Sequence, residues 1–144
     1  MSENDSPLAI TSAHQLRAAL GRRFPEIRPY GEDDWDWTWA DEGMDYLDAG
    51  DYAMAELKFQ QVVVSQPDHC DGYEGLALLY QRIGSRREAL ILIDEAVRIA
   101  RLHVNRGWMD PEVLEEIAAE RESILGMPTE PERGLRPASD DPEP

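Results

Sequence analysis

The residue types that most often carry out chemistry in proteins are scarce in this chain. The sequence holds three histidines and a single cysteine, Cys70, which are too few for most metal sites. His69 and Cys70 are neighbours, and neighbouring side chains on a helix point about 100° apart, so we do not expect them to share one ion. Near a helix start Cys70 could have a lowered pKa, but the sequence shows no partner for it, which favours a structural thiol. The sequence thus predicts no metal and no cofactor.

The carboxylates are abundant but lack the spacing of known sites. The acidic run that begins at Asp33 invites comparison with a calcium loop, which needs oxygen ligands at alternate positions and a glycine at the sixth. Counted from Asp34, the sixth residue is Trp39, so the pattern fails. The sequence also lacks G-x-G-x-x-G, Walker, G-x-S-x-G and H-E-x-x-H motifs. We predict that the chain is not an enzyme, and only a reactive Cys70 thiol would keep that alternative open.

Charge narrows the class of partner. The formal net charge is −16 at pH 7. Binding of phosphates needs clustered Lys and Arg, so this balance argues against nucleic acid and against anionic membrane surfaces. A basic or apolar protein partner suits it better, although excess acid also simply keeps a chain in solution. No apolar run approaches a membrane span, and the start at Met1 lacks the regions of a signal peptide, so we expect a cytoplasmic protein.

The middle of the chain reads as two tandem copies of one 34-residue unit, over residues 36–69 and 70–103. Trp39 in the first copy holds the place of Tyr73 in the second. A fixed period of this length is typical of stacked repeats, in which each unit buries its apolar face against the next. Further pairs at the same spacing are Tyr46 with Tyr80, Gly50 with Gly84, Ala55 with Ala89, Phe59 with Ile93 and Val62 with Ala96.

The pattern resembles the tetratricopeptide repeat, a helix–turn–helix unit with W-x2-L-G-x2-Y on its first helix. The resemblance implies an all-α fold: a short α-solenoid of two repeats with flanking N-terminal and C-terminal capping helices. Two positions depart from the pattern. Glu42 stands where the family has a large apolar residue, and Arg101 stands where it has the closing proline. The missing proline predicts that the last repeat helix runs on past its usual end.

Local signals place the helices and their ends. Ser12 with Gln15 is a capping pair for a short helix that the segment from Gly21 to Pro29 breaks, and this helix either packs on the first repeat or swaps onto a neighbour. Gly50 and Gly84 can adopt the positive φ that ends a helix. The other expected helices are 34–48, 52–65, 69–83, 86–102 and 111–125, with caps at Asp51, Asp68, the Ser85–Glu88 pair and Asp110 before Pro111.

The expected domain organisation follows from these elements. A helical domain spans 11–126 and closes with the capping helix at 110–125. Residues 1–10 and the acidic, proline-rich tail 127–144 are predicted to be disordered, because they hold too little apolar surface to form a core.

The resemblance also implies a binding surface, because the first helices of tetratricopeptide repeats line a concave groove. Trp37 and Met44 suit apolar anchors, although Trp37 would also fit simple packing against the N-terminal helix. Ala40 and Met44 stand where the family's clamp for C-terminal carboxylates has Lys and Asn, so binding of chaperone tails is not expected. The predicted partner-binding residues are Trp37, Met44, Leu47, Asp48, Glu74, Leu78, Gln81 and Arg82.

Taken with the charge, this surface predicts a non-catalytic protein–protein interaction module, an adaptor or chaperone that binds an apolar or basic peptide or helix of a partner protein. A narrower alternative is a chaperone for apolar substrates of bacterial type III secretion, because Gly50-Asp51-Tyr52 and Gly75-Leu76-Ala77 are similar to that group, although those chaperones usually carry three repeats. A further alternative is a homo-oligomeric structural subunit whose groove is filled by another copy or by its own tail.

Overall fold

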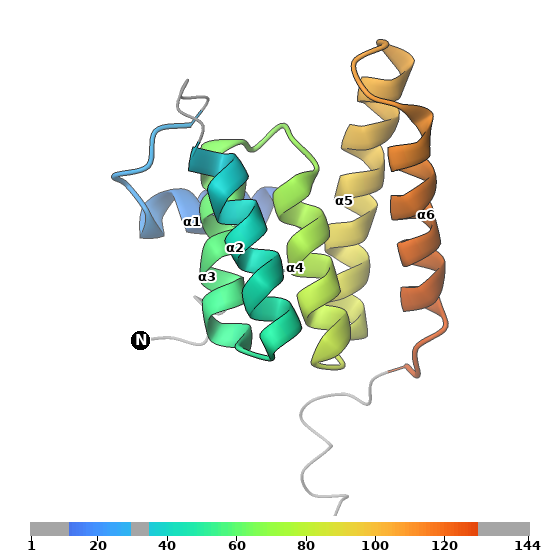
Figure 1. The fold of residues 1–144 in the computed structure, drawn as a ribbon, viewed down its shortest axis with the longest axis horizontal. Helices are drawn as coiled ribbons and strands as arrows, with labels where there is room; N and C mark the ends of the chain where they lie inside the picture. Colours follow the sequence, from blue (N-terminus) through green and yellow to red (C-terminus); the bar gives the residue numbers. More distant parts are fainter. Residues whose placement is uncertain (1–11, 30–34, 130–144) are drawn as a thin grey trace, which may run out of the picture.

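The fold was examined in a computed structural model, which describes residues 12–29 and 35–129, without the side chains of 35–37. These residues form α-helices and no strand, which confirms the all-α expectation (Figure 1). None of the helices in these two ranges is both long and apolar enough to cross a membrane. The helices are α1 (Ala13–Arg23), α2 (Trp35–Ala49), α3 (Tyr52–Ser65), α4 (Asp71–Arg82), α5 (Arg86–Asn105) and α6 (Pro111–Leu125).

The turns inside the two repeats have the same geometry. Gly50 and Gly84 adopt φ angles of 82° and 85°, in the left-handed region that favours glycine. In both turns the next backbone N–H returns to the helix, since Asp51 N donates to the Tyr46 carbonyl at 2.9 Å and Ser85 N donates to Tyr80 at 2.8 Å. These bonds satisfy carbonyls at the helix end that would otherwise lack a partner, and the predicted turns are confirmed.

The cap predictions were right at two helix starts. The Ser12 side chain accepts a hydrogen bond from Gln15 N at 3.1 Å, and the Asp51 side chain accepts one from Met54 N at 3.3 Å. At α5, Ser85 takes the cap position but its side chain makes no cap hydrogen bond.

Helix α1 ends at Arg23, inside the segment from Gly21 to Pro29 that was predicted to break it, and Gly21 is accommodated within the helix. The predicted start of α4 was wrong. Helix α4 begins at Asp71 with Cys70 as its cap residue, so Asp68 does not cap it and His69 lies outside it. The last repeat helix runs past Arg101, the usual place of the closing proline, as predicted, but it continues to Asn105 and not only to Leu102.

Helices α2 to α5 stand side by side as two hairpins, and α6 stands beside α5 at the far end (Figure 1). The Phe59 side chain of α3 lies at the centre of the first contact. A Cβ atom placed on Gly43 of α2 would lie 2.6 Å from the Phe59 ring, and one placed on Gly75 of α4 would overlap it. Glycine at these two positions therefore lets three helices close around one aromatic ring.

The repeat aromatics are buried to different degrees. Tyr73 and Tyr80 of α4 are at most 1% exposed, whereas Trp39 and Tyr46 of α2 are half-buried. Both buried hydroxyls are satisfied, because Tyr73 donates to the Pro67 carbonyl and Tyr80 donates to a carboxylate of α3, each at 2.8 Å. The second repeat thus forms the centre of the core.

Helix α1 crosses α3 and α5, so it joins both hairpins instead of capping the first repeat alone (Figure 1). Its apolar side chains Leu16 and Leu20 are at most 3% exposed. Arg17 Nη1 donates to the Tyr73 hydroxyl at 3.2 Å and to Glu95 Oε2 at 3.0 Å, which ties α1 to α4 and α5. At the other end, Met127 is half-buried against the core, although the tail was predicted to begin there. The predictions for residues 1–10 and 130–144 lie outside the described residues.

Candidate functional site

The predicted binding surface lies where α2 and α4 run side by side. Arg82 Nη1 donates to the Leu47 carbonyl at 3.4 Å, and Arg82 Nη2 lies 3.8 Å from Asp48 Oδ1. Asp48 and Arg82 hold the same place in the two repeat copies, so residues 34 apart in sequence are neighbours in space. This register aligns Met44 of α2 with Leu78 of α4 on the same face.

The structure divides the predicted site residues into surface and core. Met44 is 38% exposed, and the side chains of Asp48 and Arg82 are also exposed. Leu47 is only 1% exposed, so its assignment to the surface was wrong: it packs into the core between the hairpins. The side chain of Trp37 lies outside the described residues. The remaining predicted residues, Glu74, Leu78 and Gln81, are half-buried.

The surroundings of Met44 are acidic. On the same helix, Asp41, Asp45 and Asp48 are all exposed. The nearest basic group along this face, Arg82, is already held by Asp48 and the α2 backbone. An apolar, flexible methionine on a helix that also exposes three carboxylates is suited to contact a ligand that is itself apolar and basic.

Helix α6 covers the second half of this face. Gln81 Nε2 donates to Ser123 Oγ of α6 at 2.9 Å. Glu74 hydrogen-bonds Glu120 of α6, and the burial of Glu74 together with that neighbour raises the Glu74 pKa to about 9, with smaller contributions from Asp71 and Glu116. The Glu74 carboxyl group therefore holds its proton at neutral pH.

The contact between α6 and α4 was not predicted from the sequence. The C-terminal helix was predicted to lie outside the 34-residue register of the repeats, and it does lie outside that register. The reason is helix length, because α5 has 20 residues where α3 has 14, which delays the start of α6. The apolar face of Pro111–Leu125 predicted the packing, but only the length of α5 determined which α4 residues it reaches.

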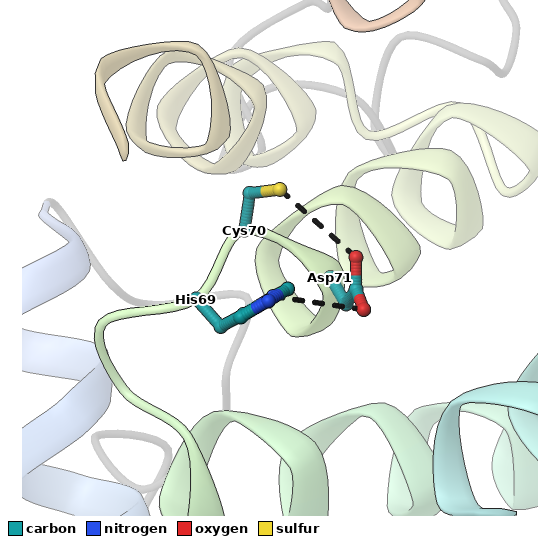
Figure 2. A group of neighbouring side chains, drawn as sticks. All are labelled: His69, Cys70 and Asp71. Carbon is teal, nitrogen blue, oxygen red and sulfur yellow. Dashed lines mark hydrogen bonds and ion pairs between the residues drawn. The ribbon is translucent and has the colours of Figure 1, made fainter. Parts of the chain in front are cut away.

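A second cluster of polar side chains lies at the start of α4 (Figure 2). The ligand atoms of His69, Cys70 and Asp71 all lie within 4.8 Å of one another. Cys70 Sγ is 4.0 Å from Asp71 Oδ1, and His69 Nδ1 is 3.6 Å from Asp71 Oδ2. The expectation that His69 and Cys70 would point apart was wrong, because His69 precedes the helix and does not follow the helical rotation.

The end of α5 adds a further imidazole to this region. The ring of His103 meets the His69 ring edge to face, with 6.1 Å between the centroids, and Trp108 packs on its other side at 5.5 Å. Burial and the neighbouring His69 and Arg106 lower the pKa of His103, so this ring is neutral at pH 7. A signal for this contact existed in the sequence, since His103 lies 34 residues after His69.

The chemistry available to Cys70 follows from its position. Burial, followed by the negative charges of Asp71 and Glu74, raises the pKa of the Cys70 thiol to about 12. The possibility of a lowered pKa at the helix start is thereby contradicted. A thiol that stays protonated at neutral pH is a weak nucleophile.

Comparison with known proteins adds no family to this geometry. No protein-family model, no curated protein and no solved structure matched the chain. The functional proposals therefore depend on the residues of the α2–α4 face and of the His69 cluster alone.

Proposed function

We propose that this chain is a non-catalytic protein–protein interaction module that binds an amphipathic, basic peptide or helix across α2 and α4. The observation that carries the proposal is the exposed Met44, on a helix that also exposes the carboxylates of Asp41, Asp45 and Asp48. Apolar anchors provide contact area, and the acidic rim steers a basic partner and sets its orientation.

The helix arrangement supports the proposal. Two hairpins with matching glycine turns place residues 34 apart next to each other, as a tetratricopeptide-like solenoid does. In this reading α2 and α4 are the two first helices of the repeats, and α6 takes the third position, where its contact with Gln81 closes one end of the surface. The predicted anchor Trp37 would extend the surface at the start of α2.

Substitution of the anchors tests the proposal. We expect Met44→Ala and Leu78→Ala each to weaken partner binding about 5- to 30-fold, which corresponds to roughly 1–2 kcal/mol for one lost anchor. Binding is measured by titration calorimetry with a partner recovered from native lysate and then purified. The melting temperature of Met44→Ala should stay near that of wild type, because its side chain is exposed.

Leu102→Ala is the matched control, because Leu102 on α5 is 39% exposed, like Met44 at 38%, but lies outside this face. Equal loss of affinity in Met44→Ala and Leu102→Ala would contradict the assigned surface. Light scattering of the isolated chain distinguishes foreign binding from self-assembly: a concentration-dependent oligomer that Met44→Ala dissociates would favour a homo-oligomeric subunit.

A further inference from the structure

Four side chains with metal-binding atoms gather between the start of α4 and the end of α5. His69, Cys70 and Asp71 follow one another in the chain, and their ligand atoms lie within 4.8 Å of one another (Figure 2). His103 approaches from α5, with its ring centroid 6.1 Å from that of His69. Thiolate, imidazole and carboxylate are together the ligand types of zinc sites.

The distances are close to those of a tetrahedral site. With Zn–S of about 2.3 Å and Zn–N or Zn–O of about 2.0 Å, ligand atoms stand roughly 3.3–3.6 Å apart, and two imidazole centroids on one ion stand roughly 5 Å apart. The separation of His69 Nδ1 from Asp71 Oδ2 is 3.6 Å, and that of Cys70 Sγ from Asp71 Oδ1 is 4.0 Å. For His69, Cys70 and Asp71, whose ligand atoms all lie within 4.8 Å of one another, closure around an ion requires movements of about 1 Å, which side-chain rotation supplies.

We propose that the chain binds one Zn²⁺ ion through Cys70 Sγ, a ring nitrogen of His69 and the carboxylate of Asp71, with His103 as the fourth ligand. The Cys70 thiol loses its proton to solvent as the Zn–S bond forms. This site goes beyond the proposed binding of a protein partner, because it lies at the helix ends and not on the α2–α4 face.

Charge and access agree with a cation. The amino end of α4 carries a partial positive charge of about half a unit, which opposes a cation, but the carboxylates of Asp68 and Asp71 outweigh it. The thiolate and imidazole ligands favour zinc over calcium or magnesium, which prefer oxygen ligands. The side chains of His69 and Asp71 are 35% and 36% exposed, so an ion can enter, whereas the 1% exposure of Cys70 shields the Zn–S bond from water.

Cobalt(II) substitution and zinc competition test the proposal on the full chain, kept reduced and free of metal at the start. We expect one equivalent of cobalt to produce the thiolate-to-cobalt charge-transfer band and the visible bands of a tetrahedral site, and zinc to abolish both. Cys70→Ser should remove the charge-transfer band and weaken zinc binding on the order of 100-fold or more, and His103→Gln should weaken it about 10-fold.

His14→Gln is the matched control, because His14 is the third histidine of the chain, is exposed on α1 and is not a member of the cluster. It should bind zinc like wild type. With 30 acidic residues, weak cation binding at surface carboxylates is expected in every variant. The proposal is overturned if cobalt gives no charge-transfer band, or if Cys70→Ser and His69→Gln, shown to be folded by circular dichroism, keep the affinity of wild type.

Discussion

At the scale of single residues, the chain places an acid in an environment that keeps it neutral. Glu74 is packed between α4 and α6 and hydrogen-bonds Glu120, while Asp71 and Glu116 add further negative charge. Removing a charge from water costs free energy, and a second carboxylate nearby raises that cost, so the proton is retained. Because a glutamate occupies this position, the free energy of unfolding depends on pH, and a single substitution of Glu74 can reveal that dependence.

We predict that Glu74→Gln stabilises the chain at pH 7 by about 1–3 kcal/mol, because glutamine is neutral without taking up a proton and can still donate to Glu120. The folded-state pKa of about 9 lies above the ordinary 4.5. The stability that the proton contributes is therefore fully present below about pH 4.5 and is lost as pH rises to about 9.

Urea unfolding of the wild type and of the variant from pH 4 to pH 10 measures this pH dependence. The difference between the two free energies of unfolding is used, because the contributions of the other acidic groups cancel in it. The gain from Glu74→Gln should grow through that window and then level off. Glu115→Gln, which removes a charge from an exposed position on α6, should show no such trend. Parallel stability curves for Glu74→Gln and wild type would rule out a raised pKa of Glu74 in the folded chain.

At the scale of elements, glycine sets how closely the helices approach. The Phe59 ring of α3 fills the space left by Gly43 of α2 and Gly75 of α4. In the repeat pattern Gly43 was recognised as a position of the first helix, but Gly75 was not expected to face the same ring. The salt bridge between Lys58 Nζ and Glu42 Oε1, at 3.0 Å, then explains how a charged residue is accommodated where the family has an apolar one.

We predict that Gly75→Ala destabilises the chain by about 1–3 kcal/mol, because the added methyl group overlaps Phe59 and neither helix can move without opening the core. Thermal or urea unfolding provides the measurement. Gly21→Ala is the matched control, since a Cβ at Gly21 meets nothing within 4 Å and alanine favours the helix by about 0.5–1 kcal/mol. If both variants changed stability in the same direction, close helix approach would not be the role of Gly75.

At the scale of the whole molecule, net charge opposes the compact fold. A charge of −16 on 144 residues produces repulsion that the ion pairs among the described residues offset only locally. Against this repulsion stands one continuous apolar core that draws on every helix from α1 to α6, from Leu16 to Ile124. The acidic character that suits a basic partner is thus a cost to the isolated chain.

We predict that added salt stabilises this chain. Raising ionic strength from about 10 mM to about 150 mM shortens the Debye length from about 30 Å to about 8 Å, which should screen the repulsion and raise the free energy of unfolding by on the order of 1 kcal/mol. Thermal unfolding in sodium chloride and in choline chloride measures this stabilisation. Equal stabilisation by the two salts would identify screening of the charge repulsion as its cause. A lower melting temperature at the higher ionic strength would show that local ion pairs dominate.

Much of the fold could be read from local signals. Gly50, Gly84 and Pro111 mark helix ends because backbone geometry alone restricts what can follow them, and the structure places turns or a helix start there. The repeat period also predicted that Tyr73 and Tyr80 share a buried face. The all-α class, the turns and the charge of the molecule were therefore determined by the sequence itself.

The sites depended on the tertiary structure, because a helical period tells which residues share a face but not which neighbour covers it. Leu47 is buried in the tertiary core, and the raised pKa of Glu74 depends on α6, whose register follows from the length of α5. The convergence of His69 and Cys70 depends on α4 beginning only at Asp71. Long-range packing decided these contacts, and a sequence pattern of local spacing does not contain them.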